Sequence, residues 1–399
     1  MTDYDVDVAV VGAGPAGSVV ALELARRNVR VLVLEKRQEI GAPKRCAEGI
    51  SAPSLQQLGL ELDSRWVAQK IVATRLYSPK MREVTIAPKG LLGYILERKI
   101  FEKYLAAEAI KHGAKYLVKT TVTDVIKEDG RVAGVKAQSW GEEITVRAKI
   151  VIAADGVDSM TAKRAGIDTV NKLGDYHSGF QYEMAGVNAD IDKLHIFIGS
   201  TIAPKGYVWI FPKGNTMANV GIGILGDKSA DGARAKDLLD RFIEGNPRFF
   251  AGASPIEANG GGIPVNISVK TFVADGFMII GDAAQQVNPI HGGGIALAMS
   301  AARMAAKVAA EALTAGDYSR ERLLAYENEW KKTDGAEIQR ILKLRHFVEK
   351  LDDNDLDSLV DVLSGDDVLR LMDGDNKFLL KVLLTKAPKL LSLARKFLQ

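Results

Sequence analysis

The hydrophobic positions at the start of the chain change their spacing twice, which predicts a strand, a helix and a second strand. Residues 5–11 form a run rich in β-branched side chains that is continuously apolar from residue 8, as expected for a parallel strand buried on both faces. Helical spacing follows a glycine turn at residues 12–17, and the apolar run 29–34 ends at Glu35. This order is typical of an α/β, Rossmann-like nucleotide-binding domain.

Further along, the pattern predicts an insertion into that first domain. Residues 97–112 have the spacing of an amphipathic helix, and residues 115–154 read as a meander that returns to the first sheet. Residues 175–275 alternate with period two and predict an antiparallel sheet, before a further strand and a long helix of small residues.

We therefore expect three regions, the first of them discontinuous. The nucleotide-binding domain is predicted at 1–70, 96–165 and 272–315. An antiparallel-sheet substrate domain is predicted at 71–95 and 166–271, and a helical C-terminal region at 316–399.

One predicted strand, YVWIFPKG at residues 207–214, is apolar on both faces. Tyr207, Trp209 and Phe211 alternate with Val208 and Ile210, so aromatic side chains would share one face and aliphatic ones the other. Taken alone, an aromatic stripe on a sheet is more often plain core than a binding surface.

The composition is that of an ordinary globular protein. The chain has 399 residues, 47% of them hydrophobic and 26% charged, and its net charge of +3 does not favour binding to nucleic acid. The single cysteine, Cys46, excludes an internal disulfide framework and fits a reducing cytoplasm. No apolar run reaches the ~20 residues of a membrane-spanning helix, so any membrane contact is expected at the surface.

The glycine turn carries the first chemical signal. Gly12, Gly14 and Gly17 form G-x-G-x-x-G, in which the glycines allow a tight turn, close approach of a pyrophosphate, and close packing of helix on strand. Glu35, at the end of the second strand, is placed to bind the ribose hydroxyls. The turn predicts a dinucleotide site and leaves NAD and FAD open.

Two later stretches decide between these cofactors. AADGVDS at 153–159 and GDAAQQVNP at 281–289, together with the glycine turn, resemble the flavoprotein monooxygenase superfamily of the p-hydroxybenzoate hydroxylase fold. The resemblance implies that FAD is the cofactor and that Asp282 holds a ribityl hydroxyl. It also implies that Gly293, Gly294 and Ile295 begin a helix beneath the flavin, whose amides stabilise negative charge there.

The same resemblance implies that Arg98 contacts the cofactor and that the backbone of Val122 meets the adenine. From the residues alone, Asp282 could cap a turn, Arg98 could be a solvated helix residue and Val122 could be core. The positions assigned to FAD are Gly12, Gly14, Ala16, Gly17, Glu35, Lys36, Cys46, Ala47, Gly49, Arg98, Val122, Asp155, Gly281, Asp282, Gly293, Gly294 and Ile295.

The aromatic strand narrows the family. Y-x-W-x-F-P, followed by Gly221 and Gly223, and PKRCAEGIS at 43–51 together resemble the geranylgeranyl reductases, particularly the archaeal digeranylgeranylglycerophospholipid reductases. Ala47 departs from the glycine that some members carry after the cysteine. The resemblance implies reduction of double bonds in geranylgeranyl ether phospholipids.

A polyprenyl chain needs wide apolar walls, and we expect Tyr207, Trp209 and Phe211 to supply one. A proton must accompany the hydride, and the resemblance places Cys46 and His291 near the flavin as candidate donors. Cys46 could equally be a small filler, and His291 a helix-start residue.

Other functions and partners stay open at this point. The alternatives are an aromatic hydroxylase or halogenase on the same fold, and a non-catalytic flavin-containing lipid carrier. The electron donor could be a ferredoxin or a reduced nicotinamide, because the chain has no second glycine turn of this kind and no cysteine cluster. The segment 377–399 has six basic and no acidic residues and predicts contact either with anionic lipid or with the acidic stretch 349–375.

Overall fold

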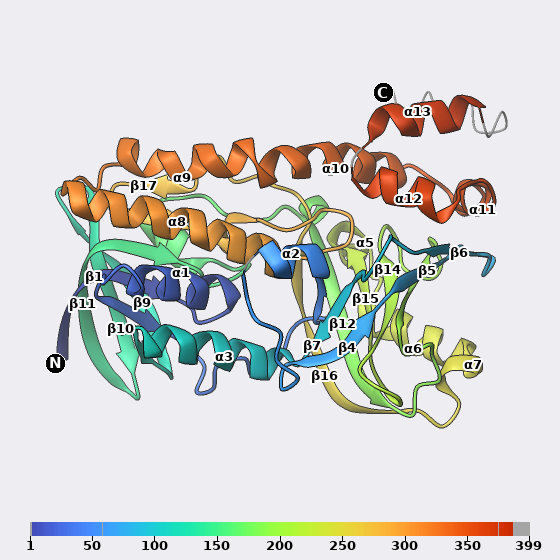
Figure 1. The fold of residues 1–399 in the computed structure, drawn as a ribbon, viewed down its shortest axis with the longest axis horizontal. Helices are drawn as coiled ribbons and strands as arrows, with labels where there is room; N and C mark the ends of the chain where they lie inside the picture. The colour runs from blue at the N-terminus through green and yellow to red at the C-terminus, as the bar shows by residue number, and fades with distance from the viewer. Residues whose placement is uncertain (1, 58, 374, 386–399) are drawn as a thin grey trace.

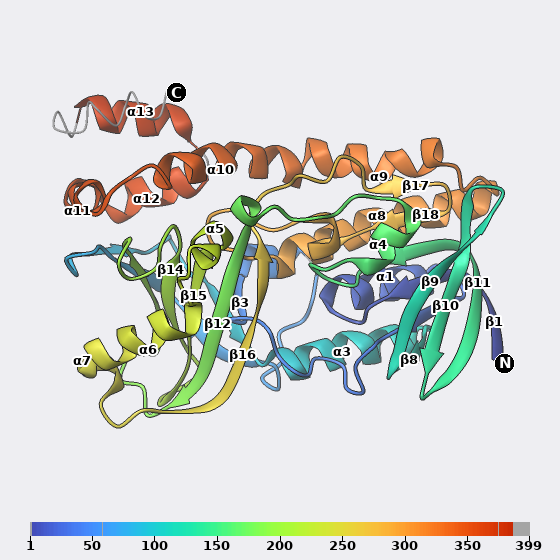
Figure 2. The same ribbon diagram turned by 180° about the vertical axis from the view of Figure 1, so that it is seen from behind.

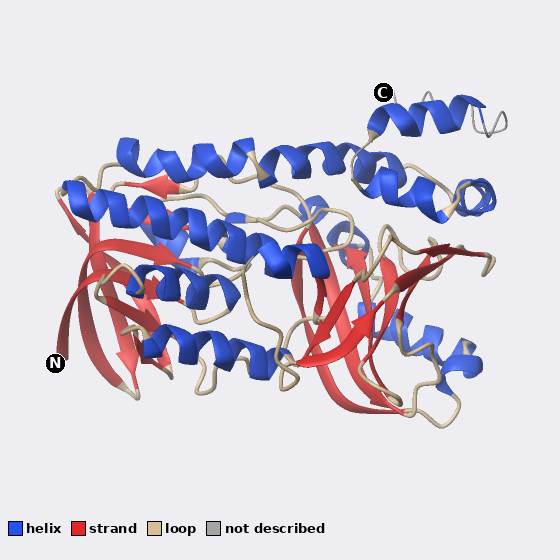
Figure 3. Cartoon of the chain, viewed as in Figure 1, coloured by secondary structure: helices blue, strands red, loops and turns tan. Residues whose placement is uncertain are grey.

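The computed structural model describes residues 2–57, 59–373 and 375–385. Its strands gather into two groups at opposite ends of the molecule, with helices lying between and above them (Figures 1 and 3). The N-terminus starts the first group, and the last helices lie beyond the second. The two large groups of strands therefore form separate sheets.

The first sheet has eight strands, and its centre is parallel. The central strand β1 (Thr2–Val11) pairs in parallel with both β2 (Val31–Leu34) and β11 (Glu142–Ala153). The sheet is completed by β8 (Lys115–Leu117), β9 (Thr120–Glu128), β10 (Arg131–Ser139), β17 (Val273–Ala274) and β18 (Phe277–Ile279). The strands expected from the two apolar runs at the N-terminus are confirmed.

Three helices cover one face of this sheet, with α1 between the other two (Figure 1). They are α1 (Pro15–Ala25), α3 (Arg98–Lys111) and α8 (Ile295–Ala315). The small residues of α8 pack closely on α1, which brings residues near 295 against the glycine turn. The shorter elements here are α4 (Met160–Ala165) and the 3₁₀ helices η1 (Leu173–Asp175) and η2 (Gly281–Ala284).

The second sheet has seven strands in the order β16-β12-β15-β14-β13-β5-β6, with β16 as the edge strand nearest the first sheet (Figure 2). The strands are β5 (Ala73–Tyr77), β6 (Glu83–Ile86), β12 (Tyr176–Ala185), β13 (Lys193–Ile198), β14 (Tyr207–Pro212), β15 (Met217–Leu225) and β16 (Ser254–Pro264). All pairings are antiparallel except β13 with β5, which is parallel.

The sequence predicted only strands between residues 175 and 275, but three helices also lie there. They are α5 (Gly226–Ala230), α6 (Ala235–Gly245) and α7 (Pro247–Phe250). Helix α6 packs on β12 and β15 and closes the second hydrophobic core. A small third sheet lies between the two large ones. It consists of β3 (Gly49–Ser51), β4 (Val67–Ile71) and β7 (Gly93–Leu96), and α2 (Ala52–Gln57) follows β3.

The C-terminal region is helical, as expected, over the residues that the structure describes. Helix α9 packs on α8, and α11 and α12 contact β6 of the second sheet. The helices are α9 (Arg320–Lys332), α10 (Asp334–Val348), α11 (Asp353–Val362), α12 (Gly365–Met372) and α13 (Asn376–Thr385). Most of the basic segment 377–399 lies outside the described residues. No helix in the described part of the chain is long and apolar enough to cross a membrane.

Candidate cofactor and substrate cavity

The glycine turn between β1 and α1 has the close contacts that its sequence predicts. Gly12 has φ +101°, and a Cβ there would lie 2.4 Å from the Ala154 carbonyl oxygen. A Cβ on Gly17 would lie 1.9 Å from the carbonyl oxygen of Gly12, so only glycine lets the helix approach this closely. At Gly14 a Cβ would meet nothing within 4 Å, because this residue borders open space.

Glu35 is held beside that turn by two backbone groups. One carboxylate oxygen accepts a hydrogen bond from Ala13 N–H at 2.8 Å, and the other accepts from Arg37 N–H at 2.9 Å. The acid is therefore fixed in place by the same turn that it would serve, and each oxygen keeps a further lone pair for a ligand hydroxyl.

The carboxyl ends of β11 and β18 bring two more predicted acids to this edge. Asp155 accepts hydrogen bonds from Ser159 Oγ at 3.1 Å and Thr161 N–H at 3.0 Å, so it caps the start of α4. Asp282 follows β18 and lies close to Gly294, where α8 begins. Burial raises the pKa of Asp282, against the lowering effect of Arg98.

These groups line one cavity of about 1290 Å³ that runs between the two large sheets. Ordinary small-molecule sites measure about 300–1,000 Å³, so this cavity has room for a dinucleotide and part of a second molecule. The sequence-predicted residues on its wall are Gly12, Gly14, Ala16, Glu35, Lys36, Cys46, Ala47, Gly49, Arg98, Val122, Asp155, Tyr207, Trp209, Phe211, Gly281, Asp282, His291, Gly293, Gly294 and Ile295. Gly17 is not on the wall, in keeping with its packing role.

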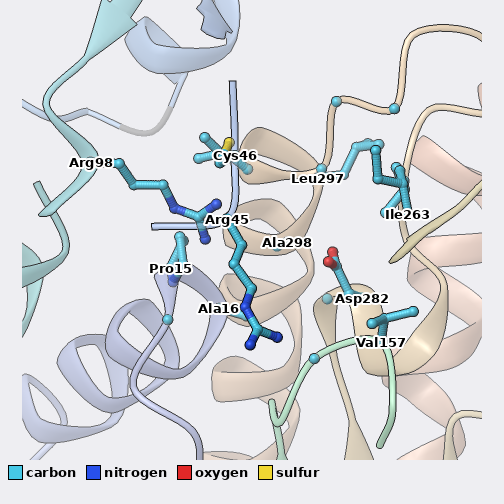
Figure 4. A pocket seen from close by; sticks show the side chains of 18 of the residues that line it. Pro15, Ala16, Arg45, Cys46, Arg98, Val157, Ile263, Asp282, Leu297 and Ala298 are labelled. Carbon is cyan, nitrogen blue, oxygen red and sulfur yellow. The ribbon is translucent and has the colours of Figure 1, made fainter. Parts of the chain in front are cut away.

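The residues present fit FAD. The helix start at Gly14–Ala16 and the fixed Glu35 carboxylate line the cavity, and the Asp282 carboxylate points into it (Figure 4). Open amides at a helix N-terminus suit a diphosphate, and two spaced carboxylates suit two sets of hydroxyls.

Near the middle of the cavity, Cys46 and Arg98 point toward each other (Figure 4). Burial lowers the pKa of Arg98, but Glu102 and the Cys46 sulfur raise it more, and the net shift is upward. The Cys46 Sγ accepts a hydrogen bond from Glu48 N–H at 3.1 Å. The thiol therefore lies between a backbone donor and a guanidinium.

His291 is held by its own loop and by the aromatic strand. Its Nδ1 accepts from Gly293 N–H at 3.1 Å, and its carbonyl oxygen accepts from the Tyr207 hydroxyl at 2.6 Å. The surrounding protein lowers the pKa of His291 to about 4 by desolvation. The ring is therefore uncharged at neutral pH.

The two faces of strand β14 meet different environments. Val208 and Ile210 are 0% exposed and belong to the second hydrophobic core. Tyr207, Trp209 and Phe211 point the other way and line the cavity, with centroid separations of 5.7 and 6.5 Å between successive rings. The expected aromatic wall is thus on the cavity side of the sheet.

Glycines and one amide fix the position of that wall. A Cβ on Gly221 of the neighbouring strand would lie 2.3 Å from Trp209 Cζ2, so the indole lies flat on a bare backbone. The Trp209 Nε1–H donates to Gln181 Oε1 at 2.9 Å. The Phe211 ring approaches the position of a Cβ on Gly49 to 3.3 Å. The contact of Trp209 with Gly221 explains the first glycine of the G-x-G that follows the aromatic strand in the sequence.

Beyond the aromatic rings the cavity is lined by aliphatic side chains from several elements, namely Ile71, Leu92, Leu194, Ile196, Ile338 and Ile341. Leu194 and Ile196 are alternate residues of β13, so they share one face of the second sheet. Arg303, Asp334 and Glu337 provide polar groups on the same wall. The cavity therefore joins a polar dinucleotide cradle to an apolar section.

A buried polar cluster behind the cysteine loop was missed at the sequence level. Lys44, Glu48, Glu183, Lys213 and Asn219 contact one another from segments up to 175 residues apart. Charged residues are usually solvated, and a single sequence gives no signal that pairs such distant positions. Arg45, also missed, points into the cavity (Figure 4).

Comparisons with known proteins agree with this geometry. The model of the FAD dependent oxidoreductase family matches residues 7–175, and that of the geranylgeranyl reductase catalytic domain matches residues 175–263. The chain is similar to the digeranylgeranylglycerophospholipid reductase of Methanothrix thermoacetophila, with 42% identity over 96% of this chain and 97% of the relative. The corresponding protein of Methanosarcina acetivorans is 45% identical over 90% of this chain and 88% of its own.

Solved structures give the same assignment. A geranylgeranyl bacteriochlorophyll reductase-like protein from Thermoplasma acidophilum matches with a TM-score of 0.90 and 36% identity, covering 99% of this chain and 100% of that one. A flavin-dependent brominase matches with a TM-score of 0.74 and 22% identity over 93% and 94% of the two chains, which shows a shared fold alone. The chain belongs to the geranylgeranyl reductase family of FAD-dependent oxidoreductases, among the digeranylgeranylglycerophospholipid reductases.

Proposed function

We propose that the protein uses FAD to reduce double bonds in the geranylgeranyl chains of archaeal-type ether phospholipids. The observation that carries this proposal is the single cavity that joins the dinucleotide cradle to an apolar section walled by Trp209, Ile196 and Ile71. An extended hydrocarbon can lie in that section with few polar groups around it. The reductase names of the relatives support the same substrate class.

The residues of the first sheet would hold the cofactor. The amides at the start of α1 would hold the diphosphate, Glu35 the adenosine ribose, and Asp282 the ribityl chain. The start of α8 at Gly294 and Ile295 directs backbone N–H groups into the cavity, where they favour negative charge. Reduced FAD, when bound, supplies the hydride for one carbon of the double bond.

The other carbon of the double bond needs a proton, and the structure favours Cys46 over His291 as its source. The His291 ring is neutral at neutral pH, and its Nδ1 already accepts a hydrogen bond from Gly293 N–H. The Cys46 thiol faces the cavity beside Arg98, whose positive charge stabilises the sulfur after its proton leaves. Tyr207 is a poor donor, because burial raises the pKa of its hydroxyl.

The electrons would come from a separate carrier, a ferredoxin or a reduced nicotinamide. We also propose that the protein, located in the cytoplasm, meets its lipid at the membrane surface, with the basic segment 377–399 as the contact. Flotation with anionic vesicles, comparing the full chain with a chain ending at residue 376, tests the second point. Equal flotation of the two would contradict it.

The test of the main proposal is anaerobic. Protein reduced with dithionite is incubated with a digeranylgeranyl phospholipid, and mass spectrometry counts the hydrogen pairs added to the lipid. We expect stepwise addition of hydrogen pairs together with reoxidation of the flavin. Reduced flavin that persists beside unchanged lipid would contradict the proposal, and an oxygenated or halogenated product in air would point to the chemistry of its fold neighbours.

A further inference from the structure

The loop that carries Cys46 is anchored by a cluster of buried ionised side chains. Lys44 and Lys213 are each 2% exposed, Glu48 is 1% exposed and Glu183 is 12% exposed. Lys44 contacts both Glu48 and Glu183, and Lys213 lies 2.9 Å from Glu48 Oε2 and 3.4 Å from Glu183 Oε2. Glu97, which is 39% exposed, also lies 3.0 Å from Lys213. Two lysines and three carboxylates therefore form one network that is largely out of water, an arrangement that depends on good geometry.

Glu48 is the residue of this cluster that ties three parts of the chain together. Its Oε1 accepts from the backbone N–H of Arg98 at 2.8 Å, where α3 begins. Its Oε2 accepts from Asn219 Nδ2 at 2.8 Å on β15 and from Lys213 on the adjoining turn. A single carboxylate thus joins the cysteine loop to the first domain and to the second sheet.

The backbone of Glu48 contributes directly to the thiol. Its φ is +72°, in the left-handed region that a residue with a Cβ seldom occupies. In this conformation its N–H donates to Cys46 Sγ at 3.1 Å. Such a conformation persists only where the surroundings impose it, and the four partners of the carboxylate do so.

We propose that Glu48 is a positioning residue for Cys46. Its buried carboxylate holds the left-handed turn that directs the Glu48 N–H onto the sulfur and keeps the thiol beside Arg98, facing the cavity. Glu48 borders the cavity, but its side chain is 1% exposed and its carboxylate is taken up by four protein partners, so in this scheme it acts through Cys46. The kinetic part of the inference rests on the proposed function, and the geometric part does not.

The chemistry of the site explains why an acid is needed. Every partner of the Glu48 side chain is a donor: a backbone N–H, an amide NH₂ and two ammonium groups. A glutamine of the same shape would place its own NH₂ against one of these donors in either orientation. Glu48→Gln therefore disturbs the anchor without changing the volume of the side chain.

The chain contains one cysteine, so its alkylation by iodoacetamide reports on Cys46 alone. The rate is measured on FAD-loaded protein and compared with the rate of the same chain unfolded in urea. We expect the alkylation rate of the native protein to differ from that of the unfolded chain. Glu48→Gln should shift the alkylation rate of the folded protein by about tenfold toward the unfolded value. Glu183→Gln, which removes a charge from the same cluster but leaves the Arg98 and Asn219 bonds of Glu48, is the matched control. It should lower thermal stability and keep the native alkylation rate within about twofold.

Lipid reduction gives the second readout. Glu48→Gln should lower kcat with KM for the lipid unchanged, because the hydrocarbon contacts other residues. If that variant does not fold, Asn219→Ser removes one anchor and should shift the alkylation rate in the same direction. A folded Glu48→Gln protein with the native alkylation rate, or the same shift in Glu183→Gln, would overturn the inference. Absence of lipid reduction by the wild-type protein would instead count against the proposed function, and the alkylation result would still stand.

Discussion

The indole N–H of Trp209 donates to the side-chain oxygen of Gln181 at 2.9 Å, across two strands of the second sheet. The amide nitrogen of Gln181 in turn donates to the carbonyl oxygen of Cys46 at 3.0 Å. One side chain therefore sets both the aromatic wall and the loop of the candidate proton donor. The spacing between the Trp209 indole and the Cys46 backbone is therefore set by this amide.

The first prediction concerns that wall. Trp209→Ala should weaken lipid binding by about 1–3 kcal/mol, which is about ten- to a hundredfold in Kd, because a large apolar contact is lost. FAD content should stay unchanged, since the cradle lies on the first sheet. Lipid titration and thermal unfolding on one preparation provide the measurement.

Ile210→Ala is the matched control, because Ile210 lies on the opposite face of the same strand in the second core. It should cost about 2–5 kcal/mol of unfolding free energy and leave the lipid Kd of the folded protein unchanged. A Trp209→Ala protein that melts early yet binds lipid normally would mean that Trp209 acts as core.

The second prediction tests the bare backbone under the indole. In Gly221→Ala, the new methyl group would lie 2.3 Å from Trp209 Cζ2, so the ring must move. We expect a loss of about 1–3 kcal/mol in stability together with weaker lipid binding. Gly245→Ala, where a Cβ meets nothing within 4 Å, should be neutral or stabilising in both measurements. Equal behaviour of the two variants would show that the indole does not need the glycine.

The third prediction concerns Glu35. Glu35→Ala should weaken FAD retention through lost ribose hydrogen bonds, each worth about 1.5–3 kcal/mol to a charged acceptor. It also frees Ala13 N–H within the glycine turn, which adds to the effect. Equilibrium dialysis against free FAD measures the change, with Glu23→Ala on the exposed side of α1 as the control. Wild-type retention in Glu35→Ala would remove the acid from the ribose site.

The fourth prediction separates chemistry from packing at Cys46. Cys46→Ser should keep FAD and lipid affinity but slow alkene reduction, because a hydroxyl is a far weaker acid than a thiol. Single-turnover reoxidation of the reduced flavin by lipid measures the step directly. Unchanged turnover per folded molecule, with only a shift in melting temperature, would assign Cys46 to packing.

The fifth prediction is a pH dependence of stability. Burial lowers the pKa of both His177 and His195 from 6.5 to about 4. The unfolded chain therefore binds more protons than the native one between these values, so stability is full above pH 6.5 and falls as the pH drops toward 4. Each histidine should cost about 2 kcal/mol near pH 5. His291, whose pKa is also lowered to about 4, contributes in the same direction. Urea unfolding at about pH 7.5 and pH 5 measures the difference, and His195→Asn should remove about one third of it.

The glycine turn, Glu35 and the alternation of the aromatic strand could be predicted because each signal is local, whereas the role of Asp282 was implied only by the family resemblance. Gly12 and Gly17 are explained by atoms a few residues or one strand away, and the alternation at 207–211 states by itself which rings share a face. To predict such features, it is enough to assign the strand or helix that carries them correctly. The core of the candidate site follows from them.

The Lys44–Glu48–Lys213 cluster and the parallel pairing of β13 with β5 could not be predicted. Both depend on which distant segments meet in space, and charged side chains carry no mark of burial in the sequence. The predicted antiparallel sheet was correct in kind, but its one parallel pairing requires the chain to cross from residue 77 to residue 193. The predicted domain bounds remain predictions.

Successive residues of strand β14 face two different environments, the second hydrophobic core and the cavity. A mutation at an even-numbered position such as Val208 mainly changes the stability of the fold. A mutation at an odd-numbered position such as Phe211 would mainly change how well the lipid fits the cavity. Under the proposed function, substitutions at the odd positions would therefore change the preferred length of the hydrocarbon chain while the melting temperature stays nearly constant. Directed evolution aimed at other isoprenoids has its natural library at those three aromatic sites.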